Sequence, residues 1–120
     1  MKALFDTNIL IDYLNGIPAA KRELDLYESH AISIITWMEV MIGGEPELAD
    51  MTRGFLNRFT SIPINEGIAE RAVRLRRERN LKLPDAIIFA TAIESGRMLV
   101  TRNTKDFGGK QPGVRHPYRV

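Results

Sequence analysis

Oxygen-bearing side chains follow several stretches of the chain that are predicted to be β-strands. Such oxygens, together with water and substrate phosphate, are the ligands that Mg²⁺ and Mn²⁺ prefer in proteins. In a parallel sheet the carboxyl ends of the strands share one edge, and ligands bind at that edge. The candidates for a metal site are Asp6, followed by Thr7 and Asn8, then Glu39, Asp85, Thr101, Asn103 and Asp106.

Each of the main candidates also has a purely structural explanation. Asp6 or the residue after it could cap the helix that follows. Thr36 and Glu39 have the spacing of a capping box, in which Glu39 accepts a hydrogen bond from the backbone of Thr36. Asp85 in a first helical turn complements the helix dipole, and Asn103 can start a turn. Their joint placement favours a site, because unrelated caps have no reason to meet at one edge.

Apolar stretches alternate with helical patterns along the whole chain. Strands are predicted over residues 3–5, 31–35, 60–64 and 98–101, and helices over 7–14, 18–29, 36–42, 46–59, 66–80 and 83–93. This alternation predicts an α/β fold built from βαβ crossovers. We expect a three-layer α/β/α arrangement around a central, mainly parallel sheet of four or five strands.

Several local features refine this prediction. Pro63 indicates that its strand lies at an edge of the sheet or ends there. An apolar stripe from Leu48 to Phe59 is typical of a core face, and part of its surface is also a candidate for receiving a partner. The loop over 108–113 leads to a tail in which Tyr118 is predicted to dock. In the helix after Asn65, the residues predicted to face the core are Ile68, Ala69, Ala72, Val73 and Leu75.

Length and composition exclude several classes of protein. With 120 residues, the chain has the size of a single domain, which we place over 1–120. The absence of cysteine excludes a disulfide framework and thiolate chemistry, and the two distant histidines, His30 and His116, disfavour zinc. The start of the sequence lacks the apolar stretch of a signal peptide, and residues 86–93 are too few to span a bilayer. We therefore expect a cytoplasmic protein with no membrane partner.

Four segments carry a resemblance to a known family. They are Phe5-Asp6-Thr7-Asn8-Ile9-Leu10-Ile11-Asp12, Ser33-Ile34-Ile35-Thr36-Trp37-Met38-Glu39-Val40, Leu83-Pro84-Asp85-Ala86-Ile87-Ile88-Phe89-Ala90-Thr91-Ala92 and Leu99-Val100-Thr101-Arg102-Asn103-Thr104-Lys105-Asp106-Phe107. Any one of them is a weak signal, but four in this order in a chain of this length are specific. Together they make the sequence similar to PIN-domain ribonucleases of the VapC toxin family along essentially its whole length.

The resemblance implies a Mg²⁺- or Mn²⁺-dependent endoribonuclease that is toxic to its own cell and silenced by a cognate antitoxin. It implies a homodimer, and a heterotetramer or larger assembly with the antitoxin. A second function stays open, in which the protein acts mainly as a non-catalytic partner in a DNA-binding toxin–antitoxin repressor complex. Cleavage of RNA would leave a 5′-phosphate and a 3′-hydroxyl.

The resemblance also assigns roles to residues of the candidate site. It makes Asp6, Glu39 and Asp85 the acidic metal-binding residues, supported by Thr7, Asn8 and Thr101. Many PIN domains have a fourth acid where this chain has Asn103, and an amide adds no charge for a second metal ion. Asp106 could compensate, although we favour a structural role for it in the short turn before Phe107.

Basic residues are concentrated just before Asp85. The net charge is only +2, but the 17 basic residues include a dense run from Arg71 to Lys82. Such a run is often no more than a solvated helix face. Beside a nuclease site it also suits RNA, because phosphate contacts dominate nucleic-acid affinity. The candidate RNA-binding residues are Arg74, Arg77, Arg79, Lys82 and Arg102.

Overall fold

Within residues 2–108 and 111–120, which the computed structural model describes, the strands form one five-stranded parallel sheet. The strands are β1 (Ala3–Phe5), β2 (Ala31–Ser33), β3 (Thr60–Ile62), β4 (Met98–Val100) and β5 (Val114–Arg115). Their order is β3-β2-β1-β4-β5, and each neighbouring pair is parallel. All the carboxyl ends therefore lie at the same edge of the sheet, as predicted.

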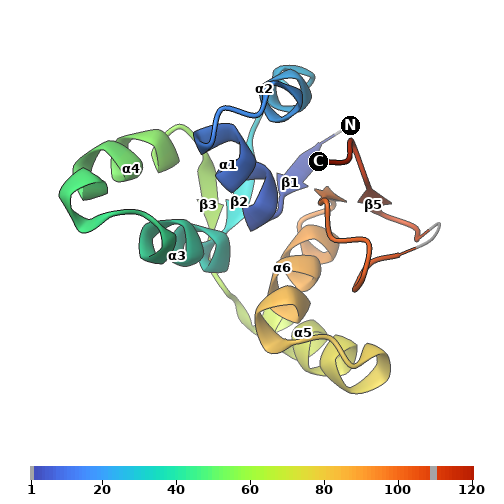
Figure 1. The fold of residues 1–120 in the computed structure, drawn as a ribbon. Coiled ribbons are helices and arrows are strands. Elements are labelled where there is room, and N and C mark those ends of the chain that lie inside the picture. Colours follow the sequence, from blue (N-terminus) through green and yellow to red (C-terminus); the bar gives the residue numbers. More distant parts are fainter. Residues whose placement is uncertain (1, 109–110) are drawn as a thin grey trace.

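Helices cover both faces of this sheet, which confirms the predicted three-layer α/β/α fold. In Figure 1, α5 and α6 lie together on one side, and α1 and α2 lie on the other. The described helices are α1 (Thr7–Leu14), α2 (Pro18–Asp25), α3 (Ile34–Gly43), α4 (Ala49–Leu56), α5 (Glu66–Arg79) and α6 (Leu83–Glu94), with a 3₁₀ turn η1 (Pro46–Leu48). Among them, no helix is long and apolar enough to cross a membrane.

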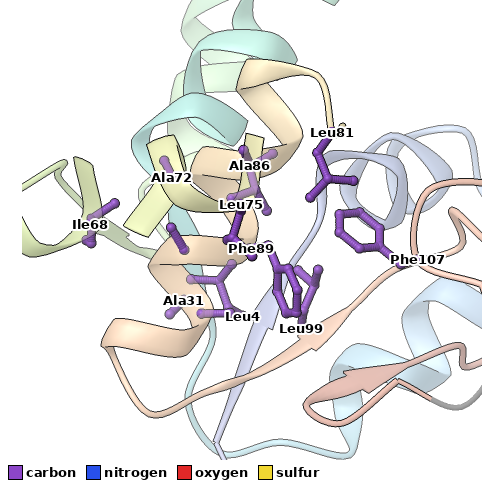
Figure 2. Close-up of a cluster of buried hydrophobic side chains, with 13 residues drawn as sticks. Leu4, Ala31, Ile68, Ala72, Leu75, Leu81, Ala86, Phe89, Leu99 and Phe107 are labelled. Carbon is purple, nitrogen blue, oxygen red and sulfur yellow. The ribbon is translucent and has the colours of Figure 1, made fainter. Parts of the chain in front are cut away.

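Alternate residues of the strands supply the two hydrophobic cores. Leu4 and Leu99 pack with Phe89 and Phe107 in the core beneath α5 and α6 (Figure 2). Phe5, one residue after Leu4, belongs to the second core, with side chains from α1 to α4. Both faces of the strands are apolar because helices cover both, and short continuous apolar runs result.

The start of α3 differs from its prediction. The strand expected over 31–35 ends at Ser33, and the helix begins at Ile34 rather than Thr36. The Ser33 hydroxyl accepts a hydrogen bond from the backbone N–H of Ile35 at 3.0 Å, so Ser33 is the N-cap. This cap outweighs the β preference of Ile34 and Ile35. The capping box predicted for Thr36 and Glu39 was wrong, because Thr36 lies inside the helix.

Other element boundaries are shorter than predicted. The helix expected over 18–29 ends at Asp25, and the one expected over 46–59 divides into η1 and α4. The strand expected over 60–64 ends at Ile62, before Pro63, and β3 is an edge strand as Pro63 indicated. At the start of β3, the N–H of Thr60 donates to the carbonyl of His30 at 2.8 Å, which begins the parallel pairing of β3 with β2.

Helix α5 buries a narrower face than predicted. Ile68, Ala72 and Leu75 are buried as expected, but Ala69 and Val73 are exposed. Only one narrow seam of α5 packs, because α6 alone is its extensive helical neighbour. Asn65 caps the helix as predicted, accepting from the N–H of Ile68 at 2.8 Å.

The C-terminal segment is more ordered than a tail. Val114 and Arg115 form β5, and the Tyr118 hydroxyl donates to Asp12 at 2.8 Å, which confirms that Tyr118 docks. A Cβ at Gly108 would collide with the Thr104 carbonyl oxygen, so the close turn here requires glycine. Of the loop predicted over 108–113, residues 109–110 lie outside the described part of the chain.

Replacing Ser33 by Ala tests the new start of α3. We expect Ser33→Ala to lower the free energy of unfolding by about 1 kcal/mol, because the Ile35 N–H loses its partner. Urea unfolding monitored by circular dichroism measures this change. Ser61→Ala, at an exposed serine of the neighbouring strand β3, is the matched control and should be near neutral. An unchanged midpoint for Ser33→Ala would contradict the cap.

Candidate active site

The side chain of Asp6 lies where β1 meets α1, and it is only 4% exposed. One carboxylate oxygen accepts from the N–H of Thr7 at 2.7 Å, which makes Asp6 the N-cap of α1. The other oxygen accepts from the Thr101 hydroxyl, also at 2.7 Å, across from β4. Asp6 therefore caps its helix and also belongs to a network at the carboxyl edge of the sheet.

Thr101 and Asn8 hold this network together. The Thr101 hydroxyl, which donates to Asp6, accepts from the side-chain amide of Asn8 at 3.2 Å and from the N–H of Asn103 at 3.0 Å. The Asn8 amide also donates to Asp6 at 3.3 Å, and its oxygen accepts from the N–H of Arg102 at 3.0 Å. The start of α1 is thus tied to the segment that leaves β4.

Glu39 reaches the same place from α3. Its carboxylate accepts from the Thr7 hydroxyl at 2.6 Å, and that hydroxyl lies 3.1 Å from the hydroxyl of buried Thr36. Thr7 consequently contacts two acids, Asp6 through its backbone N–H and Glu39 through its side chain. The structure thus gives Glu39 a partner in the site instead of the backbone of its own helix.

Asp85, in the first turn of α6, lies close enough to the other acids for their charges to raise its pKa. Partial burial raises its pKa to about 6, and repulsion from Asp6, Asp106 and Glu39 adds to the effect. Burial also raises the pKa of Asp6, with a contribution from Glu39, although hydrogen bonds from Thr101, Thr7 and Asn8 oppose the rise. The structure thus brings four acids from distant parts of the sequence into one electrostatic environment.

Asn103 and Asp106 form one unit beside these acids. The Asn103 amide donates to the Asp106 carboxylate at 2.9 Å, and the Asp106 N–H donates back to the Asn103 side chain at 3.0 Å. Asp106 therefore closes the turn before buried Phe107, which is the structural role predicted for it. The charge of Asp106 also raises the pKa of Asp85. The turn therefore places an acid near the site, although Asn103 itself is neutral.

The donor set fits an open site for a hard cation. Among residues 2–108 and 111–120, no three acidic or imidazole side chains are arranged to hold an ion by themselves. Mg²⁺ characteristically uses one or two carboxylates and completes its shell with water and substrate phosphate. The raised pKa values of Asp6 and Asp85 mark unrelieved negative charge, which a proton or a cation would neutralise.

Residues 3–108 match the family model of the PIN domain. The chain belongs to the PIN domain family. A toxin–antitoxin complex from Klebsiella pneumoniae contains a chain that is 53% identical, with coverage of 99% of this chain and 100% of that one and a TM-score of 0.94.

Two DNA-bound complexes contain more distant PIN-fold chains. One is VapBC2 from Rickettsia felis on a promoter fragment, at 26% identity, covering 95% and 96% of the two chains, with a TM-score of 0.79. The other is VapBC from Salmonella typhimurium, at 26% identity, covering 96% of each chain, with a TM-score of 0.78. A comparison with curated protein sequences found no match.

The candidate RNA-binding residues that precede Asp85 in this PIN domain differ in their contacts. Arg74 and Arg77 are exposed on α5, and Lys82 lies close enough to Asp85 to lower its pKa against the larger opposing effects. Arg79 donates to Gln111 at 2.5 Å and lies 5.7 Å above the ring of Phe89. RNA contact by these four residues stays a prediction.

Arg102 has a partner that sequence reasoning missed. Its guanidinium binds both oxygens of buried Asp12, at 2.6 and 2.8 Å, and the Tyr118 hydroxyl donates to the same carboxylate. Burial opposes ionisation, but these hydrogen bonds lower the pKa of Asp12. The pair spans 90 residues, and no local spacing signals it. Any RNA contact by Arg102 must therefore coexist with its bond to Asp12.

The raised pKa of Asp85 predicts that its charge destabilises the PIN domain. The folded pKa of about 6 exceeds the ordinary 3.8, so the folded protein holds this proton more tightly than the unfolded chain. Stability is therefore lost as pH rises from about 4 to 6. We expect Asp85→Asn to stabilise the protein by about 1 kcal/mol at pH 8, after allowance for partial exposure, and far less at pH 4.

Thermal or urea unfolding at both pH values, without divalent cations, measures this difference. Asp50→Asn, at an exposed aspartate on α4, is the matched control. Equal effects of Asp85→Asn at the two pH values would show that Asp85 does not carry the predicted charge repulsion.

Proposed function

We propose that this PIN domain is the toxin of a toxin–antitoxin pair and acts as a metal-dependent endoribonuclease. The single observation that carries the proposal is the meeting of Asp6, Glu39 and Asp85 at one sheet edge, with raised pKa values for the two aspartates. Perturbed acids that converge from distant segments are typical of catalytic sites. The likeness to chains in toxin–antitoxin complexes supports the biological role.

Asp6, Glu39 and Asp85 would hold Mg²⁺ or, in its place, Mn²⁺. When bound, such an ion stabilises negative charge on the phosphate and makes water a better nucleophile at neutral pH. The protein supplies oxygen ligands of two kinds. Three hydrogen bonds hold the carboxylate of Asp6 in place. Burial and neighbouring acids disfavour the negative charge of Asp85, and a bound cation would offset both effects.

The chain's own groups then have distinct tasks in hydrolysis. The Thr7 hydroxyl engages one Glu39 oxygen, and among the described residues no donor engages the other, Oε2. Glu39 can therefore accept a hydrogen bond from the attacking water and orient it toward phosphorus. Thr101 and Asn8 keep Asp6 in place during the reaction. In-line attack would leave a 5′-phosphate and a 3′-hydroxyl.

The antitoxin partner is proposed to cover exposed apolar side chains on α3, η1 and α4. This α3–α4 apolar surface consists of Met38, Ile42, Leu48 and Met51, with Ile42 83% and Met51 73% exposed. Met38 and Ile42 lie on the same helix as Glu39, one on either side of it in sequence. A protein segment bound there lies beside the approach to the candidate site, which accounts for inhibition by obstruction.

A non-catalytic role in a repressor complex is the second candidate, favoured by the two DNA-bound relatives. The two functions make different demands on Glu39, because only hydrolysis needs its carboxylate. Repression would survive Glu39→Gln with little change, whereas RNA cleavage would not.

Purified protein should cleave RNA in the presence of Mg²⁺ and lose that activity on chelation. We expect Asp6→Asn, Asp85→Asn and Glu39→Gln each to reduce the cleavage rate by about 100-fold or more, because each removes a charge from the site. Mapping of RNA 5′ ends measures cleavage and identifies the phosphate. Glu66→Gln, at an exposed acid on α5, is the control. Full activity in the three site variants would refute the assignment.

Charge introduced into the α3–α4 apolar surface should weaken antitoxin binding. We expect Ile42→Glu and Met51→Glu each to raise the Kd for the antitoxin encoded beside this gene by about tenfold or more. Val73→Glu, at an exposed apolar residue on α5, is the matched control. Calorimetry on purified proteins measures the affinities. A changed oligomeric state with unchanged antitoxin affinity would instead assign the surface to a second copy of the chain.

A further inference from the structure

A cavity beside the candidate active site has the chemistry of a nucleic-acid subsite. We propose that this cavity, between the segment after β4 and the C-terminal tail, binds the RNA strand next to the cleaved bond, with Arg119 contacting its phosphate. The inference rests on the proposed ribonuclease function. It adds Arg119, a residue outside every sequence motif described above, to the residues that bind substrate.

The cavity lies beside the segments that follow β4 and β5. It has a volume of about 710 Å³, and its lining includes Arg102, Thr104, His116, Tyr118 and Arg119. Strands β4 and β5 are parallel, with Val100 opposite Arg115, so the segments that follow them leave the sheet at the same edge. Two lining residues, Arg102 and Thr104, flank Asn103 in the sequence. The cavity therefore adjoins the segment 101–107, which carries Asn103 and Asp106.

Its walls are held in place before any ligand binds. Buried Asp12 joins the two sides, because Arg102 and Tyr118 both donate to its carboxylate. The two ring nitrogens of His116 lie 3.1 Å from the Thr101 carbonyl oxygen and 2.7 Å from that of Phe107. The His116 ring thus places the tail against both ends of the segment 101–107. A preformed wall of this kind lowers the entropy cost of binding a flexible strand.

The lining suits an anionic, partly aromatic ligand. Arg119 is the unpaired basic side chain of the described lining, since Arg102 binds Asp12 and both ring nitrogens of His116 face backbone carbonyls; no aspartate or glutamate belongs to this lining. Arg119 is exposed, and the half-buried ring of Tyr118 offers a face on which a base can stack. An RNA strand entering the acidic site needs cations close by, since the carboxylates repel its phosphates. The cavity supplies Arg119 for this purpose, on the side opposite to the α3–α4 apolar surface in strand order.

The chemistry favours RNA over a protein segment here. A docking groove for a helix would present an apolar floor, as the α3–α4 apolar surface does. This cavity instead combines guanidinium groups, a hydroxyl and one aromatic ring, which match phosphate, ribose and base. Its volume falls within the range of sites that enclose a ligand of nucleotide size.

Charge reversal at Arg119 tests the subsite. The Asp85→Asn protein, in which cleavage is silenced, is titrated with a short fluorescent single-stranded RNA of mixed sequence at several salt concentrations. We expect Arg119→Glu to weaken binding by about fivefold or more and to reduce the salt slope by about 0.7, the loss of one phosphate contact. Arg119→Lys, which keeps the charge, should retain most of the affinity. Thermal melting confirms that the variants fold.

Arg58→Glu is the matched control, because it makes the same charge change just before β3, at the amino-terminal edge of the sheet. If Arg58→Glu and Arg119→Glu lowered the RNA affinity equally, the effect would come from net charge alone, and the subsite would be overturned. Unchanged RNA binding in Arg119→Glu, with RNA cleavage intact in the wild type, would overturn the subsite alone, as would an effect on antitoxin binding only. A wild type that neither binds nor cleaves RNA would overturn the proposed function itself.

Discussion

The buried carboxylate of Asp6 is the constraint on which the site depends. A buried charge costs several kcal/mol unless hydrogen bonds satisfy it. Thr7, Asn8 and Thr101 supply these bonds, and they come from the start of α1 and the end of β4. The pKa of Asp6 is nevertheless raised, so the bonds do not fully offset burial and repulsion. The fold therefore tolerates electrostatic strain here, as proteins do where function requires it.

The order of the strands explains why distant acids meet. Strand β1 is the centre of the sheet, with β2 on one side and β4 on the other. The chain runs from β1 to β2 and β3 on one side and then crosses to β4 on the other side of β1. In open α/β sheets such a switch point opens a crevice at the carboxyl edge. Glu39 follows β2 and Thr101 follows β4, so each approaches Asp6 from its own side. Any shift of the register would separate them.

The surroundings of the site differ on its two sides. On the β2 side, α3 and α4 expose apolar residues such as Ile42 and Met51. On the β4 side, the tail and the segment 101–107 form a cavity that is braced by Asp12 and carries Arg119. An apolar surface suits a protein partner, and a cationic one suits a polyanion. Under the proposed function, RNA and the antitoxin would therefore bind on different sides of the acidic site.

The sequence by itself predicted the α/β class and the approximate places of four of the five described strands, because local periodicity carries that information. Residue chemistry and the family resemblance singled out Asp6, Glu39 and Asp85 as the proposed acids. The sequence did not predict β5, whose two residues are too few to show a period. It misplaced the start of α3, since a β-branched run looks like a strand until the Ser33 cap is seen. Only the tertiary structure decided that Arg102 binds Asp12, that Asp106 acts on Asp85 and that Tyr118 closes the cavity wall. Those contacts join residues far apart in the chain, and no spacing within a segment encodes them.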